Sequence, residues 1–434
     1  MSQHLVGRTR ALIILLILLL AYTLTLLRDG GALLLQPAPA AAAGPGGPTL
    51  DARRAAFSAS ASQCGHSYLE LASPPLSRSP GGCAAGLLRA FAGASRRGRD
   101  APVELAHGCG LKWFTPREAC ALVASAGSLL IIGDSLQRHL AQALMAVLSG
   151  NLVHGAALAH KLPGDAPHLL AQCACDRMYD DHAEHGGDRR CRDASAANLG
   201  SEGAPGPQTL VCPNWRRNHV HFQFVAASEK PGEGDTPWTF RRGKLVAAVE
   251  RMQKEAAEVD AAGGGSGGSD GGGGSGGRPA HGSGVFIHFA PPALHVGMAQ
   301  KDLPDVTQWF IEPLWEALRA GGGGGGRRRA VCAGLHARQA NGPPQYMEKQ
   351  GNHAVQPYNA WLAGECERTA RAAGVGVGGR LKGPASGEDA AYAGAWDSFA
   401  FTFNHSSPDG AHYDSRVNVL LAQLLLNVLE AEML

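Results

Sequence analysis

Hydrophobic positions along the chain form short apolar runs and helical repeats. Leucine and valine recur at helical spacing over 136–148 and again over 417–428. Four apolar runs have the length of a buried strand, namely Ser128–Ile132, Val220–Val225, Val285–Phe289 and Ala330–Leu335. Strands that alternate with helices predict an α/β fold with a mostly parallel central sheet. In such a sheet ligands bind beyond the carboxyl ends of the strands.

A longer apolar run, Ala11–Leu27, carries no charge and follows two arginines. It predicts one transmembrane helix of about 17 residues, roughly 26 Å long, which suits a thin early-secretory membrane. Positive charge on the short N-terminal side places residues 1–10 in the cytosol and the rest in the lumen. The pattern predicts a single-pass type II protein of the Golgi or ER membrane. A cleaved signal peptide is the alternative, because residues 38–43 offer small side chains for cleavage.

Low-complexity segments divide the remaining sequence. Residues 28–60 are rich in Ala, Pro and Gly and are interpreted as a stem. Residues 61–434 are expected to form one lumenal catalytic domain, with Gly-rich surface insertions at 263–284 and 321–326.

Composition and charge exclude some classes of protein. A hydrophobic content of 44% and seven Trp supply enough apolar side chain for a sizeable core, which excludes global disorder. Lys+Arg 39 against Asp+Glu 37 gives a net charge of +2, so nucleic acid is not expected as a partner. The short runs Arg327–Arg329 and Arg189–Arg190 are interpreted as solvated loops.

Cysteine usage agrees with an oxidising compartment, since all ten cysteines follow the apolar run and an even number suits disulfides. They are Cys64, Cys83, Cys109, Cys120, Cys173, Cys175, Cys191, Cys212, Cys332 and Cys366. Their pairing does not follow from the sequence. Cys173, Cys175 and Cys191, with His182 and His185 between them, leave a zinc site as the alternative.

The turn between the first strand and its helix reads Gly133-Asp134-Ser135. A serine at this place lies beside the unpaired N–H groups that begin a helix, so an oxyanion formed by its attack on a carbonyl meets ready donors. Gly133 allows the tight turn, and Asp134 is expected to shape it through backbone contacts. An ordinary Ser N-cap is the alternative.

A second turn, Ser407–Asp414, lies just before the last helical repeat and contains Asp409 and His412. A histidine supplies the base that a serine nucleophile needs. An aspartate three residues earlier can reach its Nδ1, fix the tautomer and stabilise the imidazolium. The two turns together predict a Ser135-His412-Asp409 triad, with an Asp N-cap as the alternative for Asp409.

These blocks resemble the PC-esterase branch of the SGNH/GDSL hydrolases, which includes trichome birefringence-like polysaccharide O-acetyltransferases and the lumenal domains of sialic acid O-acetyltransferases. The resemblance covers roughly residues 105–434. Its motifs are Cys109–Pro116, Cys120, Gly133–Arg138, Cys173–Asp176, Gln350–Asn359 and Asp409–His412.

The resemblance implies an SGNH-like three-layer sandwich with Ser135 as nucleophile, His412 as base and Asp409 as its orienting carboxylate. Gly133 and Arg138 are candidates for oxyanion or substrate binding, although Arg138 also fits a surface helix arginine. The central Gly-x-Asn pattern of SGNH enzymes is missing. His295 or His288 is the candidate substitute, each with a structural histidine as the alternative, and His336 is open to the same two interpretations.

The function implied is O-acetylation of a polysaccharide or glycan through an acyl-enzyme. An acetyl donor is expected as co-substrate, and no bound cofactor or metal is expected. The sequence does not identify a multi-spanning partner that would deliver acetyl across the membrane. A carbohydrate acetylesterase and a catalytically silent glycan-binding protein are the alternatives. The sequon Asn404-His405-Ser406 offers one glycosylation site near the second turn.

Overall fold

The computed structural model describes residues 112–155, 173–179, 191, 208–215, 217–225, 237–263, 284–291, 303–320, 327–342, 344–377, 390–403, 405, 407 and 409–433. Several predictions fall outside these residues, namely the anchor 11–27, the stem 28–60, Cys64, Cys83, Cys109, His182, His185, Arg189–Arg190, His295, Asn404 and the Gly-rich stretches 264–283 and 321–326. Among the described helices, none has both the length and the apolar character that a membrane span requires.

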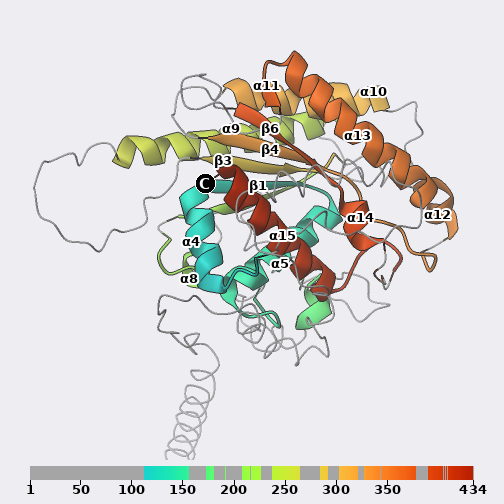
Figure 1. Ribbon diagram of the computed structural model, residues 1–434, viewed down its shortest axis with the longest axis horizontal. Helices are drawn as coiled ribbons and strands as arrows, with labels where there is room; N and C mark the ends of the chain where they lie inside the picture. The colour runs from blue at the N-terminus through green and yellow to red at the C-terminus, as the bar shows by residue number, and fades with distance from the viewer. Residues whose placement is uncertain are drawn as a thin grey trace, which may run out of the picture. The chain divides into compact units, whose positions relative to one another are not determined.

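A sheet of six strands in the order β2-β1-β3-β4-β6-β5 lies at the centre, and each strand pairs in parallel with its neighbours (Figure 1). The strands are β1 (Ser128–Gly133), β2 (Val220–Phe224), β3 (Val285–Phe289), β4 (Arg328–Ala333), β5 (Gly376–Val377) and β6 (Ala390–Trp396). The prediction of an α/β fold with a mostly parallel sheet is confirmed. The four predicted strands correspond to β1, β2, β3 and β4.

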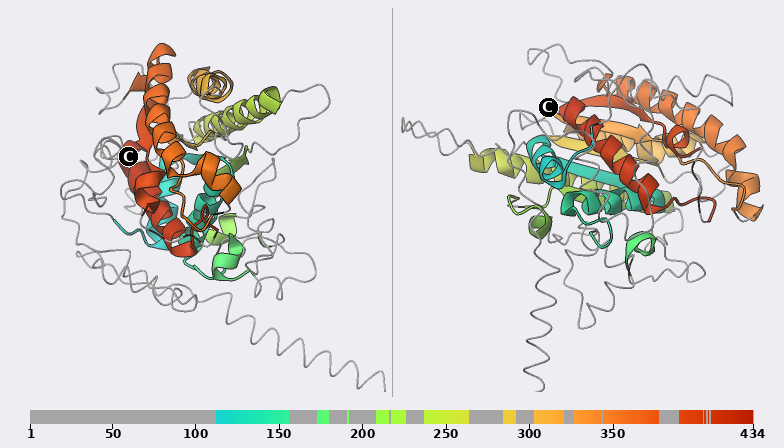
Figure 2. Two further views of the ribbon diagram at one scale, coloured as in Figure 1. Left: turned by 90° about the vertical axis from the view of Figure 1, so that its right-hand side faces the viewer. Right: turned by 60° about the horizontal axis from the view of Figure 1, so that its bottom comes forward.

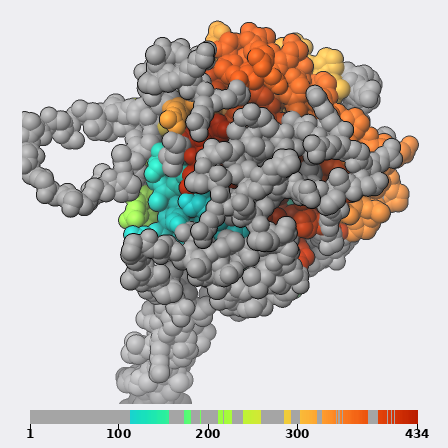
Figure 3. Space-filling model, viewed as in Figure 1, coloured from blue at the N-terminus to red at the C-terminus, as the bar shows by residue number. Residues whose placement is uncertain are grey.

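Helices cover both faces of the sheet (Figures 1 and 2). One face is covered by α4 (Pro116–Ala126), α5 (Ser135–Ser149) and α15 (Ser415–Met433), and the other by α9 (Pro237–Gly263), α11 (Glu312–Ala320) and α13 (Asn352–Ala372). The shorter elements are η3 (Cys175–Met178), α8 (Gln208–Val211), α10 (Leu303–Val306), the π-helix η8 (Thr307–Ile311), α12 (Pro344–Gln350) and α14 (Ser398–Thr402). Parts of α12 and α13 form the outer surface in Figure 3.

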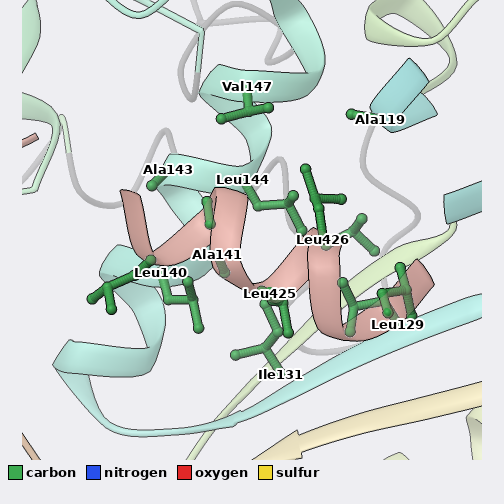
Figure 4. Packing of buried hydrophobic residues seen from close by; sticks show 14 of the residues in the cluster. Ala119, Leu129, Ile131, Leu140, Ala141, Ala143, Leu144, Val147, Leu425 and Leu426 are labelled. Atoms are coloured by element: carbon green, nitrogen blue, oxygen red, sulfur yellow. The ribbon is translucent and has the colours of Figure 1, made fainter. Parts of the chain in front are cut away.

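The continuous apolar run of β1 follows from burial on both faces. Leu129 and Ile131 belong to the core beneath α5 and α15, whereas Leu130 and Ile132 belong to the core beneath α9 and α11. Figure 4 shows Leu425 and Leu426 of α15 packed among Leu140 and Leu144 of α5, next to Leu129 and Ile131. The helical repeats predicted from leucine and valine are therefore the helices that close this face.

The last helix also binds the first described segment through paired hydrogen bonds. The backbone of Phe114 exchanges bonds of 2.8 and 3.1 Å with the side chain of Gln423. The backbone of Lys112 does the same with Asn427 at 3.0 and 2.8 Å, and Lys112 Nζ lies 2.6 Å from Glu430. Two amides thus satisfy backbone groups that no strand partner reaches, and they hold α15 against residues 112–114.

Two arginines of the run 327–329 are buried, so the prediction of a solvated loop is wrong for them. Arg328 and Arg329 begin β4 and are 7% and 5% exposed. Arg328 donates to the carbonyl of Leu318 at 2.9 Å, near the end of α11. Carbonyls at a helix end lack intrahelical donors, so an arginine can be buried against them.

Three disulfides lie among the described residues, Cys120–Cys212, Cys173–Cys191 and Cys332–Cys366, which confirms the prediction of disulfides. Cys175 is also oxidised. Because Cys173, Cys175 and Cys191 are all in disulfides, the alternative zinc site loses its three thiolates. Oxidised pairs are typical of lumenal or secreted proteins.

Candidate active site

The turn Gly133-Asp134-Ser135 joins β1 to α5 at the carboxyl edge of the sheet. Asp134 is the N-cap, and its side chain accepts from the backbone N–H of Leu136 at 3.0 Å. The expectation that Asp134 shapes the turn is confirmed, and the alternative that Ser135 is the cap is wrong. Ser135 is the first residue of α5, where the helix dipole and unpaired N–H groups favour negative charge.

The backbone conformation at position 133 requires a glycine. Its φ is 155°, and a Cβ there would lie 3.2 Å from the carbonyl oxygen of Ala290 and 2.3 Å from Cγ of Gln137. Its own carbonyl accepts from the N–H of Val225 at 2.9 Å. These contacts give Gly133 a structural part in the turn, and its binding of an oxyanion or substrate stays a prediction.

Ser135 meets His412, which lies 277 residues later in the chain. Its Oγ is 2.8 Å from Nε2 of His412, and Nδ1 of the same ring is 2.6 Å from Oδ2 of Asp409. Both side chains of the second turn are largely buried, with 18% and 19% exposed. The three predicted residues therefore form one continuous hydrogen-bonded row.

The other carboxylate oxygen of Asp409 organises its own turn. Oδ1 accepts from the backbone N–H of Ala411 at 2.8 Å and of His412 at 2.7 Å, and from Ser407 Oγ at 3.2 Å. Burial alone would raise the pKa of Asp409. The ring and backbone N–H groups of His412, with that of Ala411, instead hold it well below its usual value. Asp409 therefore stays ionised beside the histidine.

Asp414, and not Asp409, is the N-cap of the last helix. It precedes α15, and its Oδ1 accepts from the N–H of Val417 at 3.1 Å, while Oδ2 pairs with Arg416 at 2.7 Å. The helix is capped by Asp414, so Asp409 is not its N-cap.

His139, which the sequence did not single out, packs against His412. The two ring centroids are 4.8 Å apart at a tilt of 43°, and His139 is 2% exposed. Burial lowers its pKa well below the usual value, and the nearby His412 and Arg138 act in the same direction. A neutral ring therefore supports His412. Its position one turn after Ser135 on the same helix was the signal in the sequence.

Arg138 is 5% exposed, so the alternative of a surface helix arginine is wrong. Its Nη2 lies 3.3 Å from Nε2 of His139. Arg138 thus belongs to the buried layer next to the triad, and its support of an oxyanion stays a prediction.

His288 and His336 lie in the core, as expected of structural histidines. His288 packs edge-on against Trp396, and burial lowers its pKa to about 3. His336 packs against Tyr413, and burial, with Arg338 and His412 nearby, lowers its pKa to about 3 as well. Both rings are neutral at physiological pH.

Comparisons with protein-family models, with curated proteins and with solved structures found no match for this chain.

Proposed function

We propose that this protein is a lumenal, serine-dependent O-acyltransferase that acetylates a glycan through an acyl-enzyme on Ser135. The observation that carries the proposal is the row from Ser135 through His412 to Asp409 at the carboxyl edge of a parallel sheet. Such a row raises the nucleophilicity of a hydroxyl that is otherwise a weak nucleophile.

The proposed chemistry follows from the Ser135 Oγ–His412 Nε2 and His412 Nδ1–Asp409 Oδ2 distances. Ser135 Oγ attacks the acyl carbonyl carbon while its proton passes to Nε2 of His412, and Asp409 stabilises the imidazolium. The N–H groups at the start of α5 lie beside the developing oxyanion. His412 then gives the proton to the leaving oxygen, and the acyl group remains as an ester on Ser135.

A sugar hydroxyl completes the reaction by attacking this ester. His412 takes the hydroxyl proton and returns it to Ser135 Oγ as the acyl–serine bond breaks. Water in place of the sugar makes the enzyme an acetylesterase, which is the second candidate. The motif resemblance to O-acetyltransferases and the predicted type II topology favour transfer. The same resemblance makes an SGNH-like sandwich the proposed fold family, and the disulfides support a Golgi or ER lumen.

The test uses the full-length protein with 4-nitrophenyl acetate, with and without a glycan acceptor. We expect wild type to release nitrophenol and to label with a fluorophosphonate probe, and we expect Ser135→Ala to do neither while it stays folded. Acetylated glycan identifies a transferase, and acetate alone identifies an esterase. A wild-type protein that neither turns over the ester nor takes the probe is the silent alternative.

A further inference from the structure

The segment that follows β4, residues 334–342, packs against the turn that carries Asp409 and His412. Tyr413 Oη donates to the carbonyl of Ala337 at 2.8 Å, and the N–H of Gln339 donates to the carbonyl of Gly410 at 3.0 Å. A Cβ on Gly410 would lie 2.4 Å from Cα of Gly342, so the two backbones are in close contact. The position of this segment is therefore fixed relative to the triad.

Two asparagines in the first half of α13 also bind the segment 334–342. Asn352 Oδ1 accepts from the backbone N–H of Arg338. Asn359 exchanges two bonds with the backbone of Leu335, at 2.8 and 2.9 Å. Arg338 is thus held on a backbone that is hydrogen-bonded on both sides, with little freedom to move away from the site.

The guanidinium of Arg338 lies near carboxylates that adjoin both ends of the Ser135–His412 pair. Burial lowers the pKa of Arg338, whereas Asp134 and Asp409, with Tyr413, act to raise it. Asp134 precedes the nucleophile, and Asp409 holds the base. The two carboxylates thus oppose the effect of burial, and the backbone contacts of Ala337 and Gln339 with the second turn hold Arg338 beside the triad.

The Nε–H donor of this guanidinium has no hydrogen-bond partner among the described residues. Arg338 is 5% exposed. No ion pair of Arg338 is found in the described part of the chain, and the oxygens of Asp409 bind His412, Ala411 and Ser407. Burying a charged guanidinium without hydrogen-bond partners costs folding free energy. This cost argues for a ligand that accepts its hydrogen bonds.

We propose that Arg338 binds an anionic group of the substrate, a carboxylate or a phosphate, in the Ser135 site. The planar fork of an arginine matches the paired oxygens of either group. This inference rests on the proposed function and names the chemistry of its substrate. The anion belongs either to the acyl donor or to the glycan acceptor, and one guanidinium serves either.

The experiment compares 4-acetoxybenzoate with its methyl ester, two acetyl donors that differ in one negative charge. Full-length wild type is expected to prefer the anion, and Arg338→Gln to raise its KM roughly 10- to 100-fold, as for loss of a charge-assisted hydrogen bond. The neutral ester should keep its kcat/KM within about twofold in the variant. Arg338→Lys should restore part of the preference, since it keeps the charge without the fork.

An acceptor arm distinguishes the source of the anion. With the neutral donor, methyl glucuronoside is compared with its methyl ester as acyl acceptor. A preference that depends on Arg338 in either arm supports the proposal and assigns the anion to donor or acceptor. Inorganic phosphate should also raise the melting temperature of wild type and leave that of Arg338→Gln unchanged.

Two results would overturn the proposal. One is equal slowing of charged and neutral esters by Arg338→Gln, which indicates an oxyanion or packing role, and the other is no effect on either.

If Arg338→Gln does not fold, phosphate must still stabilise wild type and Arg338→Lys must still weaken that effect. Arg328→Gln, which removes a buried arginine bonded to the end of α11, is the control and should lower stability without changing the preference. Wild type inactive on every ester refutes the proposed function instead, while the phosphate shift continues to test Arg338.

Discussion

Asp409→Asn separates the chemistry of the second turn from its folding. In the native turn Oδ1 accepts two backbone N–H groups and Oδ2 accepts from the ring of His412. An asparagine can keep the backbone bonds through its one oxygen. Its amide then points N–H donors at Nδ1 of His412, which can accept only if the ring proton moves to Nε2.

That tautomer is the wrong one for catalysis. With a proton on Nε2, His412 donates to Ser135 Oγ and cannot take its proton, and the imidazolium also loses the charge beside it. We expect kcat to fall about 10⁴-fold, equivalent to ~5 kcal/mol of transition-state free energy. The free energy of unfolding should change by about 1 kcal/mol, because a neutral acceptor replaces a charged one and the helix keeps its cap at Asp414.

The assay is acyl-ester turnover with kcat and KM resolved, beside thermal unfolding of the same preparation. Loss in kcat and kcat/KM together is expected, as for a group that acts in the transition state. Asp414→Asn is the matched control and should affect stability alone. Near-normal turnover with a lowered melting temperature in Asp409→Asn would refute the assignment of Asp409 as the orienting carboxylate.

Three further predictions follow from the described contacts. Gly133→Ala should destabilise the protein by about 1–3 kcal/mol in denaturant titration, because its positive φ strains any side chain; an unchanged midpoint would contradict this. His139→Ala should lower kcat and leave KM within about twofold, with partial recovery in His139→Phe, since the ring holds His412 in place; equal activity in all three proteins would exclude a positioning role. Removing the Cys120–Cys212 bridge should cost at most ~4–5 kcal/mol for a loop of 92 residues, measured as loss of melting temperature without loss of kcat in the folded protein.

Much of the sheet was predictable because burial on both faces demands continuous apolar runs. The strands missed were β5, with two residues, and β6, whose sequence Ala390–Trp396 is rich in Ala and Gly. Such residues have little strand propensity, and only pairing with β4 makes this segment a strand. The buried start of β4 was missed for a different reason: a charged run predicts exposure, and only the carbonyl of Leu318 at the end of α11 allows Arg328 to be buried.

The triad was predictable because each half is a local motif, a glycine turn and an Asp-x-x-His turn. Residues that act through tertiary contact were not. Nothing near Arg338 in sequence signals that its backbone is held by Asn352 or that Asp134 acts on the pKa of its guanidinium. The motif Gln350–Asn359 was recognised, but its part in holding the segment after β4 emerged only from the hydrogen bonds.

The hold of α15 on residues 112–114 has a consequence for how activity arises during synthesis. A chain emerging at about 5–20 residues per second exposes Ser135 tens of seconds before His412. During that interval the nucleophile has no base, and the face of β1 that α15 covers is still open. The nascent protein cannot form an acyl-enzyme by this mechanism while its core is incomplete. Because α15 follows the turn of Asp409 and His412 directly, the proposed acyl chemistry requires the part of the chain that closes this face of the sheet.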